Sequence, residues 1–155
     1  MARTRTFGPM TLLDTAVELF WVKVYGNCSM DDVVAASGVA RYGIYQQFGD
    51  KNALYRAALS RYREQAVTML NNALNTPNGG FSEICDYFAS LSASLEQGNR
   101  RGCLASQAAI DRAQDDPQVA DIVAEIMADL RTAFASAVAV GLARGELREL
   151  PPDDL

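Results

Sequence analysis

The sequence predicts an all-α fold, in which three short N-terminal helices within residues 1–50 lead through a long helix into a larger helical part over residues 51–155. Three observations predict this fold. Apolar residues recur every three or four positions through long segments, which is the spacing of one face of an α-helix. No segment has a β-strand pattern of comparable strength. The hydrophobic content of 49% is high enough to build a core.

The first helix is predicted over residues 11–23, where apolar residues share one helical face. These residues are Leu13, Ala16, Val17 and Phe20. We expect this face to cover the helices that follow.

Residues 29–48 predict a helix-turn-helix. Ser29 and Asp32 have the spacing of a capping box, in which two side chains satisfy backbone donors at a helix start. Gly38 lies where the chain reverses, because a residue without a Cβ adopts positive φ at low cost. Such a unit can place its second helix in the DNA major groove. Most helical hairpins are packing units only, so the neighbouring segments have to decide between the two interpretations.

The rest of the chain predicts four more helices. A long helix runs from near Asp50 to about Asn75 and ends at a loop over residues 76–80; the others cover 81–97, 101–114 and 117–144. Two of them carry apolar stripes: Ile84, Phe88, Leu91 and Leu95 in the first, and Val119, Ile122, Ile126, Leu130, Ala133, Ala137 and Gly141 in the last.

Composition excludes several classes of function. The chain has no histidine, and its three cysteines are widely spaced, so we expect reduced thiols, no metal site and no cofactor. We find no nucleophile with an adjacent general base, so the sequence does not suggest an enzyme. We find neither an apolar run long enough for a bilayer nor a leader segment, so the expected location is the cytoplasm.

Charge is unevenly distributed along the chain. Residues 1–63 carry eight Lys or Arg against five Asp or Glu, whereas residues 64–155 carry six against fourteen. A basic end joined to an acidic body is expected if only one end meets phosphate. Arg3 and Arg5 could add contacts to the DNA backbone, although a solvated tail explains them equally well.

The span from Leu12 to about Tyr62 resembles the DNA-binding domain of the TetR family of one-component bacterial transcriptional regulators. The matching residues are LLDTAVELF, Tyr25, SMDDVVAASGV, Ile44-Tyr45 with Phe48, and Asp50-Lys51-x-x-Leu54. The resemblance implies a regulator, most often a repressor, that binds a palindromic operator in double-stranded DNA as a homodimer. It also implies release by a small-molecule effector.

Two departures from the family pattern matter. Members commonly carry Lys-Gly-Tyr where this chain has Lys23-Val24-Tyr25, so we expect a different turn after the first helix. Members usually carry Ser, Lys, Gly and Thr or Ala where this chain has residues 40–43, ARYG. Ala40 cannot cap the recognition helix, and Gly43 costs about 1 kcal/mol relative to Ala in a helix. We expect a weakly preformed recognition helix with its own base preference.

The candidate DNA contacts follow from these positions. We expect base or near-base contacts from Arg41, Tyr42, Gly43 and Gln46, and phosphate contacts from Ser29, Tyr45 and Lys51.

Residues 101–112 and the late helix through Leu147 resemble the ligand and dimerisation domain of many family members. This implies a small apolar or amphipathic effector bound between helices. The candidate pocket residues are Tyr87, Phe88, Cys103, Gln107, Met127 and Phe134. Core packing is the alternative for each of them. Cys103 has no flanking His or Lys, which favours an inert thiol over a sensor.

The ending of the sequence bears on dimerisation. Residues 151–155, PPDDL, look like the first turn of another helix, where family members usually continue. The chain is therefore expected either to lack the last helix or to assemble differently. An alternative function is a helical ligand-binding or interaction protein whose DNA binding has decayed.

Overall fold

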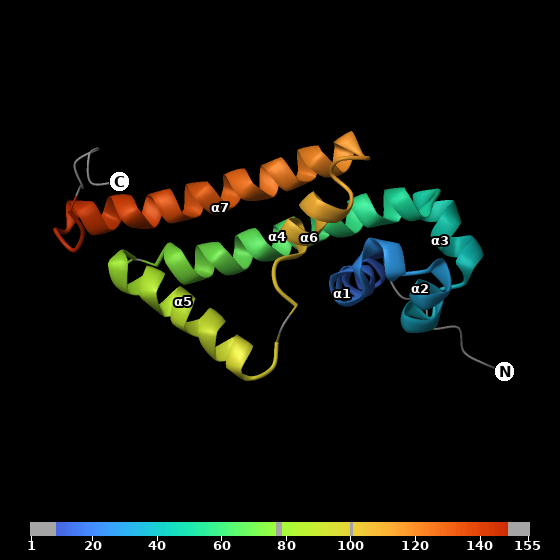
Figure 1. Ribbon diagram of the computed structural model, residues 1–155, viewed down its shortest axis with the longest axis horizontal. Coiled ribbons are helices and arrows are strands. Elements are labelled where there is room, and N and C mark those ends of the chain that lie inside the picture. Colours follow the sequence, from blue (N-terminus) through green and yellow to red (C-terminus); the bar gives the residue numbers. More distant parts are fainter. Residues whose placement is uncertain (1–8, 77–78, 100, 149–155) are drawn as a thin grey trace. The chain divides into compact units, whose positions relative to one another are not determined.

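The computed structural model describes residues 9–76, 79–99 and 101–148, and these residues form helices without any strand (Figure 1). The all-α prediction is confirmed. Arg3, Arg5 and residues 151–155 lie outside the described residues. The helices are α1 (Pro9–Asn27), α2 (Met30–Ser37), α3 (Arg41–Phe48), α4 (Lys51–Leu74), α5 (Phe81–Glu96), α6 (Leu104–Asp111) and α7 (Pro117–Ala143).

The chain forms two compact units, and the long helices α4 and α7 contribute to both. The first unit comprises residues 1–64 and 101–125, and the second comprises residues 65–100 and 126–155. Helices α1, α2 and α3 all belong to the first unit, together with α6 and the start of α7.

The core of the first unit is built on α1. Leu12, Ala16, Val17 and Phe20 are buried, as the periodicity predicted, whereas Leu13 is only partly buried. The Phe20 ring meets the Tyr55 ring of α4 edge-on, with 4.8 Å between centroids. Buried residues of the other helices complete this core: Val33, Ile44, Leu54, Ala58, Leu59, Leu104, Ala105 and Ala108. Helix α6 packs against α1 in this unit.

Helix α1 is kinked where the family pattern has a glycine. It continues to Asn27, beyond the predicted end at residue 23, but Val24 has φ 64° and ψ 155°. This backbone region is essentially restricted to glycine, and a β-branched residue is strained there. The expected difference in the turn is thus a kink that Val24 adopts against its own preference.

The second unit has a small core. Leu70 and Leu74 of α4 and Ala133 and Ala137 of α7 are buried, and four larger side chains pack against them. These are Ile84, Tyr87, Leu130 and Phe134. The buried part of the predicted α7 stripe is therefore confirmed here.

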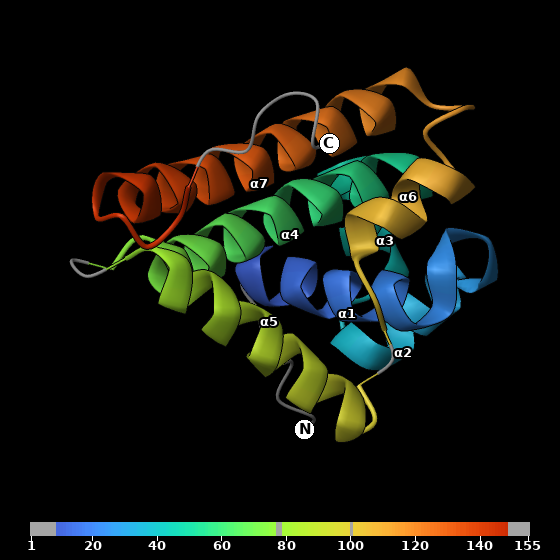
Figure 2. The same cartoon turned by 60° about the vertical axis from the view of Figure 1, so that its left-hand side comes forward.

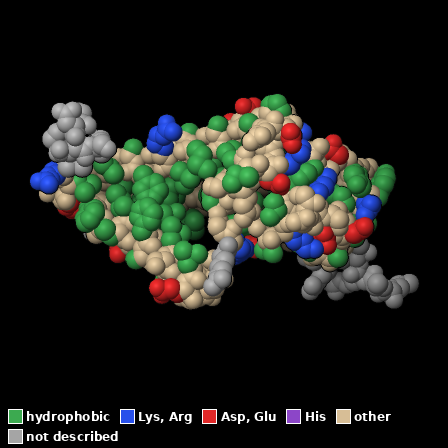
Figure 3. Space-filling view, viewed as in Figure 1, with side chains coloured by type: hydrophobic (Ala, Val, Ile, Leu, Met, Phe, Trp, Pro, Cys, Tyr) green, Lys and Arg blue, Asp and Glu red, His purple; other side chains and the backbone are tan. Residues whose placement is uncertain are grey.

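Helix α5 buries none of its residues. Within the predicted stripe, Phe88, Leu91 and Leu95 are 56%, 43% and 56% exposed. Figure 2 shows α5 leaving its connection to α4 at an angle, and Figure 3 shows hydrophobic side chains spread over this part of the surface. Periodicity identified the apolar face of α5 correctly, but it could not indicate whether other residues cover that face.

Helix α7 corrects another expectation. It has 27 residues, and by length and hydropathy alone it is long and apolar enough to cross a membrane, although the sequence analysis found no such segment. Its buried residues include Val119 and Val123 in the first unit and Ile126, Ala133 and Ala137 in the second.

Candidate nucleic-acid interface

The start of α2 is fixed by the predicted capping box. The Ser29 hydroxyl accepts a hydrogen bond from the Asp32 amide at 3.1 Å, and the Asp32 carboxylate accepts one from the Ser29 amide at 2.8 Å. Lys23 of α1 adds an ion pair to Asp32 at 2.6 Å. The hydrogen bonds from Lys23 and Ser29 lower the pKa of Asp32 to about 2. The capping prediction is confirmed, and the phosphate contact predicted for Ser29 would have to share its hydroxyl with this box.

The turn between α2 and α3 also follows the prediction. Gly38 has φ 68°, and its amide donates to the Val34 carbonyl at 2.9 Å. Ala40 precedes α3 and provides no side-chain cap. A Cβ added at Gly43 would lie 3.5 Å from the Val39 side chain, an ordinary van der Waals distance. Gly43 therefore weakens α3 without being required by close packing.

Helix α3 presents a polar and aromatic face to solvent. Ile44 is buried and anchors the helix, whereas Tyr42 is 75% and Tyr45 38% exposed. Arg41, Gln46 and Gln47 are exposed as well. Gln47 was not among the predicted contacts, although its position beside Gln46 on the predicted helix was the available signal. An exposed set of arginine, amide and tyrosine side chains has the donors and acceptors needed to contact base edges and phosphates.

Arg41 is paired across the helix-turn-helix. Its guanidinium donates a hydrogen bond to the carboxylate of Asp31, in the first turn of α2. The two side chains remain 49% and 82% exposed. Nothing in the sequence spacing singled out Asp31, because the contact joins two helices.

The side chain of Lys51 contacts the end of α1. Its ammonium donates to the Tyr25 carbonyl at 2.7 Å and lies 4.1 Å from the centroid of the Tyr25 ring. Lys51 is partly buried at the first position of α4. A phosphate contact, as predicted, would have to be made beside the kink of α1.

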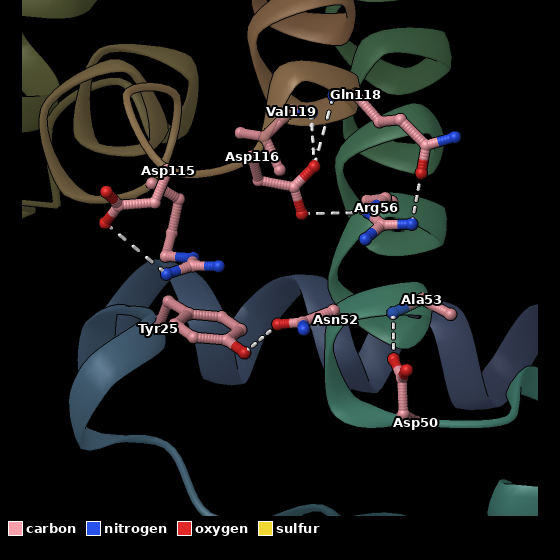
Figure 4. A network of polar contacts seen from close by, with 10 residues as sticks. Tyr25, Asp50, Asn52, Ala53, Arg56, Asp115, Asp116, Gln118 and Val119 are labelled. Carbon is pink, nitrogen blue, oxygen red and sulfur yellow. Dashed lines mark hydrogen bonds and ion pairs between the residues drawn. The ribbon is translucent and has the colours of Figure 1, made fainter.

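A polar network joins the end of α1 to α4 and to the start of α7 within the first unit (Figure 4). The Tyr25 hydroxyl donates to Asn52, and Arg56 forms a 3.0 Å ion pair with Asp116. Burial raises the pKa of Asp116, but the hydrogen bond from Arg56 and those from the Val119 and Gln118 amides outweigh it and leave the pKa lowered. Asp116 thereby caps the first turn of α7.

Most of the cations among the described N-terminal residues are paired with carboxylates. Ion pairs join Lys23 to Asp32, Arg41 to Asp31, Arg56 to Asp116, Arg61 to Asp14 and Glu64, and Arg63 to Glu125. Net charge along the sequence therefore overstates how many cations this region could offer to phosphate.

The predicted effector residues divide between the two units. In the second unit the rings of Tyr87, Phe88 and Phe134 meet, with centroids 5.5–5.9 Å apart. Met127 is partly buried in the same unit. Cys103 and Gln107 belong to the first unit.

The thiol of Cys103 is partly buried and lies beside the Tyr62 hydroxyl. Burial raises the pKa of its thiol, but hydrogen bonds from the Ser106 amide and from the Tyr62 hydroxyl outweigh burial and lower it. The carboxamide of Gln107 donates to the Arg101 carbonyl at 2.6 Å.

Comparisons with known proteins agree with this geometry. Residues 12–58 match the model for bacterial regulatory proteins of the tetR family. An uncharacterised HTH-type transcriptional regulator, YezE of Bacillus subtilis, is 27% identical over 77% of this chain, which spans 62% of that protein. The HTH-type transcriptional repressor ComR of Escherichia coli is 26% identical over 94% of this chain and 70% of ComR.

A solved structure shares the fold. The transcriptional regulator FadR from Bacillus subtilis, in complex with stearoyl-CoA, superposes with a TM-score of 0.65 at 20% identity. The match covers 92% of this chain and 75% of FadR. The helix-turn-helix, its cap, its glycine turn and the family match together show that residues 12–58 are the DNA-binding domain of the TetR family of bacterial regulatory proteins.

Proposed function

We propose that this chain is a repressor that binds a palindromic operator as a homodimer through α3 and is released by a small apolar or amphipathic effector. The observation that carries the DNA-binding part is the face of α3, where Arg41, Tyr42, Gln46 and Gln47 are exposed around the buried anchor Ile44. Repression is supported by the similarity to ComR, a repressor.

The proposed DNA contacts follow the geometry of α3. Arg41, Tyr42, Gly43 and Gln46 meet base edges near the start of the helix, while Ser29, Tyr45 and Lys51 meet phosphates. In a dimer, two copies of α3 would read half-sites about 34–36 Å apart.

The effector is proposed to bind in the second unit, against the cluster of Tyr87, Phe88 and Phe134. Partly exposed aromatic rings beside exposed leucines suit an apolar ligand. FadR, which shares the fold, was solved with stearoyl-CoA, so a long-chain acyl-CoA is the first ligand to test. Met127 of the same unit remains a candidate contact, whereas Cys103 and Gln107 belong to the first unit. Release would follow if the effector favours a state with lower operator affinity.

A selection experiment tests the proposal. The purified chain is used to enrich duplexes from a random-sequence pool at about physiological salt, and its mass in solution is measured in parallel. We expect a palindromic site, a dimer mass, and weaker binding of that site when stearoyl-CoA is added. Failure to enrich any sequence would overturn the DNA-binding part, and unchanged operator affinity with the acyl-CoA would overturn this choice of effector.

A second function is supported by the start of α3. Ala40 gives this helix no side-chain cap, and Gly43 lowers its propensity, as in a helix that has lost its selection for DNA reading. The chain would then be a helical ligand-binding or interaction protein. Acyl-CoA binding by a chain that enriches no DNA sequence would favour this function.

A further inference from the structure

We propose that Asp31 is a specificity determinant of the operator, acting by holding Arg41 in position for a guanine contact. This inference rests on the proposed DNA binding and adds to it a residue outside the recognition helix. The carboxylate of Asp31 accepts a hydrogen bond from the guanidinium of Arg41, so that the first turn of α2 is tied to the first residue of α3.

Asp31 lies in a turn of α2 whose backbone is held by several contacts. Its neighbour Asp32 closes the capping box with Ser29 and pairs with Lys23 at 2.6 Å. The backbone of the first turn of α2 is therefore fixed by three contacts immediately beside Asp31. The Asp31 side chain thus leaves a fixed backbone turn, and its carboxylate is oriented by the bond to Arg41.

Because the Arg41 side chain is half exposed, packing alone does not fix its orientation. Arg41 is the first residue of α3, and Ala40 before it supplies no cap. An arginine at the start of a recognition helix can contact the O6 and N7 atoms of guanine with two donors. The guanidinium has five N–H donors, so the bond to Asp31 leaves enough of them for this contact.

Asp31 would also lower the affinity for DNA of any sequence. A carboxylate at the DNA-facing surface is repelled by phosphate, and this repulsion acts equally on every sequence. At the operator, the guanine contact of Arg41 offsets this repulsion. Asp31 thus lowers non-specific affinity and orients the group that supplies the specific contact.

The test uses the site enriched from the random pool and the same duplex with its guanines replaced one at a time. For the unsubstituted chain we expect one guanine whose replacement weakens binding about 5- to 150-fold, the range of a good bidentate contact. Asp31→Asn should reduce this ratio severalfold and strengthen binding to unrelated duplexes. Asp31→Glu should restore most of the ratio, because the carboxylate is kept.

A double variant separates positioning from a general charge effect. In the Arg41→Ala background, Asp31→Asn should no longer change the ratio at that guanine, because the residue through which it acts is gone. Asp121→Asn, at an exposed position of α7, is the control with the same change of charge. Melting temperatures confirm that each variant is folded.

Three results would overturn the inference while leaving the proposed function standing. They are an unchanged ratio in Asp31→Asn, an equal loss in the presence and absence of Arg41, and an equal loss in the Asp121→Asn control. If the unsubstituted chain enriches no sequence, the proposed function fails first, and this inference fails with it.

Discussion

The two compact units of this chain differ in how completely their apolar side chains are buried. In the first, α1 buries four apolar side chains, three aromatic rings meet at its end, and ion pairs connect its helices. In the second, α5 buries no residue and exposes Phe88, Leu91 and Leu95. The contrast indicates that the first unit is held by its own contacts, whereas the second retains apolar surface that a ligand or another surface could cover.

Two phenylalanines test this contrast most strongly. Phe20 is 0% exposed and Phe88 is 56% exposed. Phe20→Ala should lower the free energy of unfolding by about 3–5 kcal/mol, because it opens a cavity in the core. Phe88→Ala should cost about 1 kcal/mol or less, the value of its contacts with two rings. Urea denaturation of both variants measures the difference, and similar losses would remove the distinction between the units.

The kink of α1 is the weak point of the well-packed unit. Val24→Gly should raise the stability by about 1 kcal/mol, because relief of a strain of about 1–3 kcal/mol exceeds the entropy cost of glycine. Thermal melting checks this prediction. Val22→Gly is the matched control, since Val22 is 65% exposed on the same helix, and it should lower the stability by about 0.5 kcal/mol. A loss of stability in both variants would show that Val24 is not strained.

The recognition helix can be strengthened at one position. Gly43→Ala should stabilise the protein by about 0.5–1 kcal/mol, because alanine has a higher helix propensity than glycine. The added Cβ would lie 3.5 Å from the Val39 side chain, which is an ordinary contact distance. Thermal melting measures the stability, and circular dichroism reports the helix content. Destabilisation would mean that the new methyl group clashes after all.

The smallest expected effect is on the stability of the protein at low pH. The pKa of Asp32 is lowered to about 2 from a usual 3.8, so its contribution to stability is complete above about pH 4 and is lost as the pH falls toward 2. In Asp32→Asn, this part of the acid dependence should disappear. Melting temperatures between pH 2 and pH 6, with Asp121→Asn as control, test it. Parallel pH profiles for wild type and Asp32→Asn would contradict the assignment.

These predictions also separate what the sequence could reveal from what it could not. The helices, the capping box of Ser29 and the turn at Gly38 depend on local patterns, and each was predicted. The exposure of the apolar face of α5 was not predicted, because periodicity locates such a face but does not show which residues cover it. The strain at Val24 was anticipated only as an altered turn, because no propensity rule places a β-branched residue at positive φ.

The candidate site shows the same limit. The exposure of Arg41, Tyr42, Tyr45 and Gln46 on α3 follows from the helix that was predicted. The ion pair of Arg41 with Asp31 and the capture of Lys51 by Tyr25 join residues of different helices. Sequence spacing carries no signal for such contacts, so the basic end predicted from charge counts proved to be largely paired.

The central claim is that the exposed face of α3 reads a DNA sequence. It is tested most directly by the ratio of the affinities of the full chain for its enriched duplex and for a scrambled duplex of the same length at about 0.15 M salt. We expect a ratio of about 10³ or more, as for specific regulators, and a fall toward one in Arg41→Ala combined with Gln46→Ala. A ratio near one for the unsubstituted chain would contradict it.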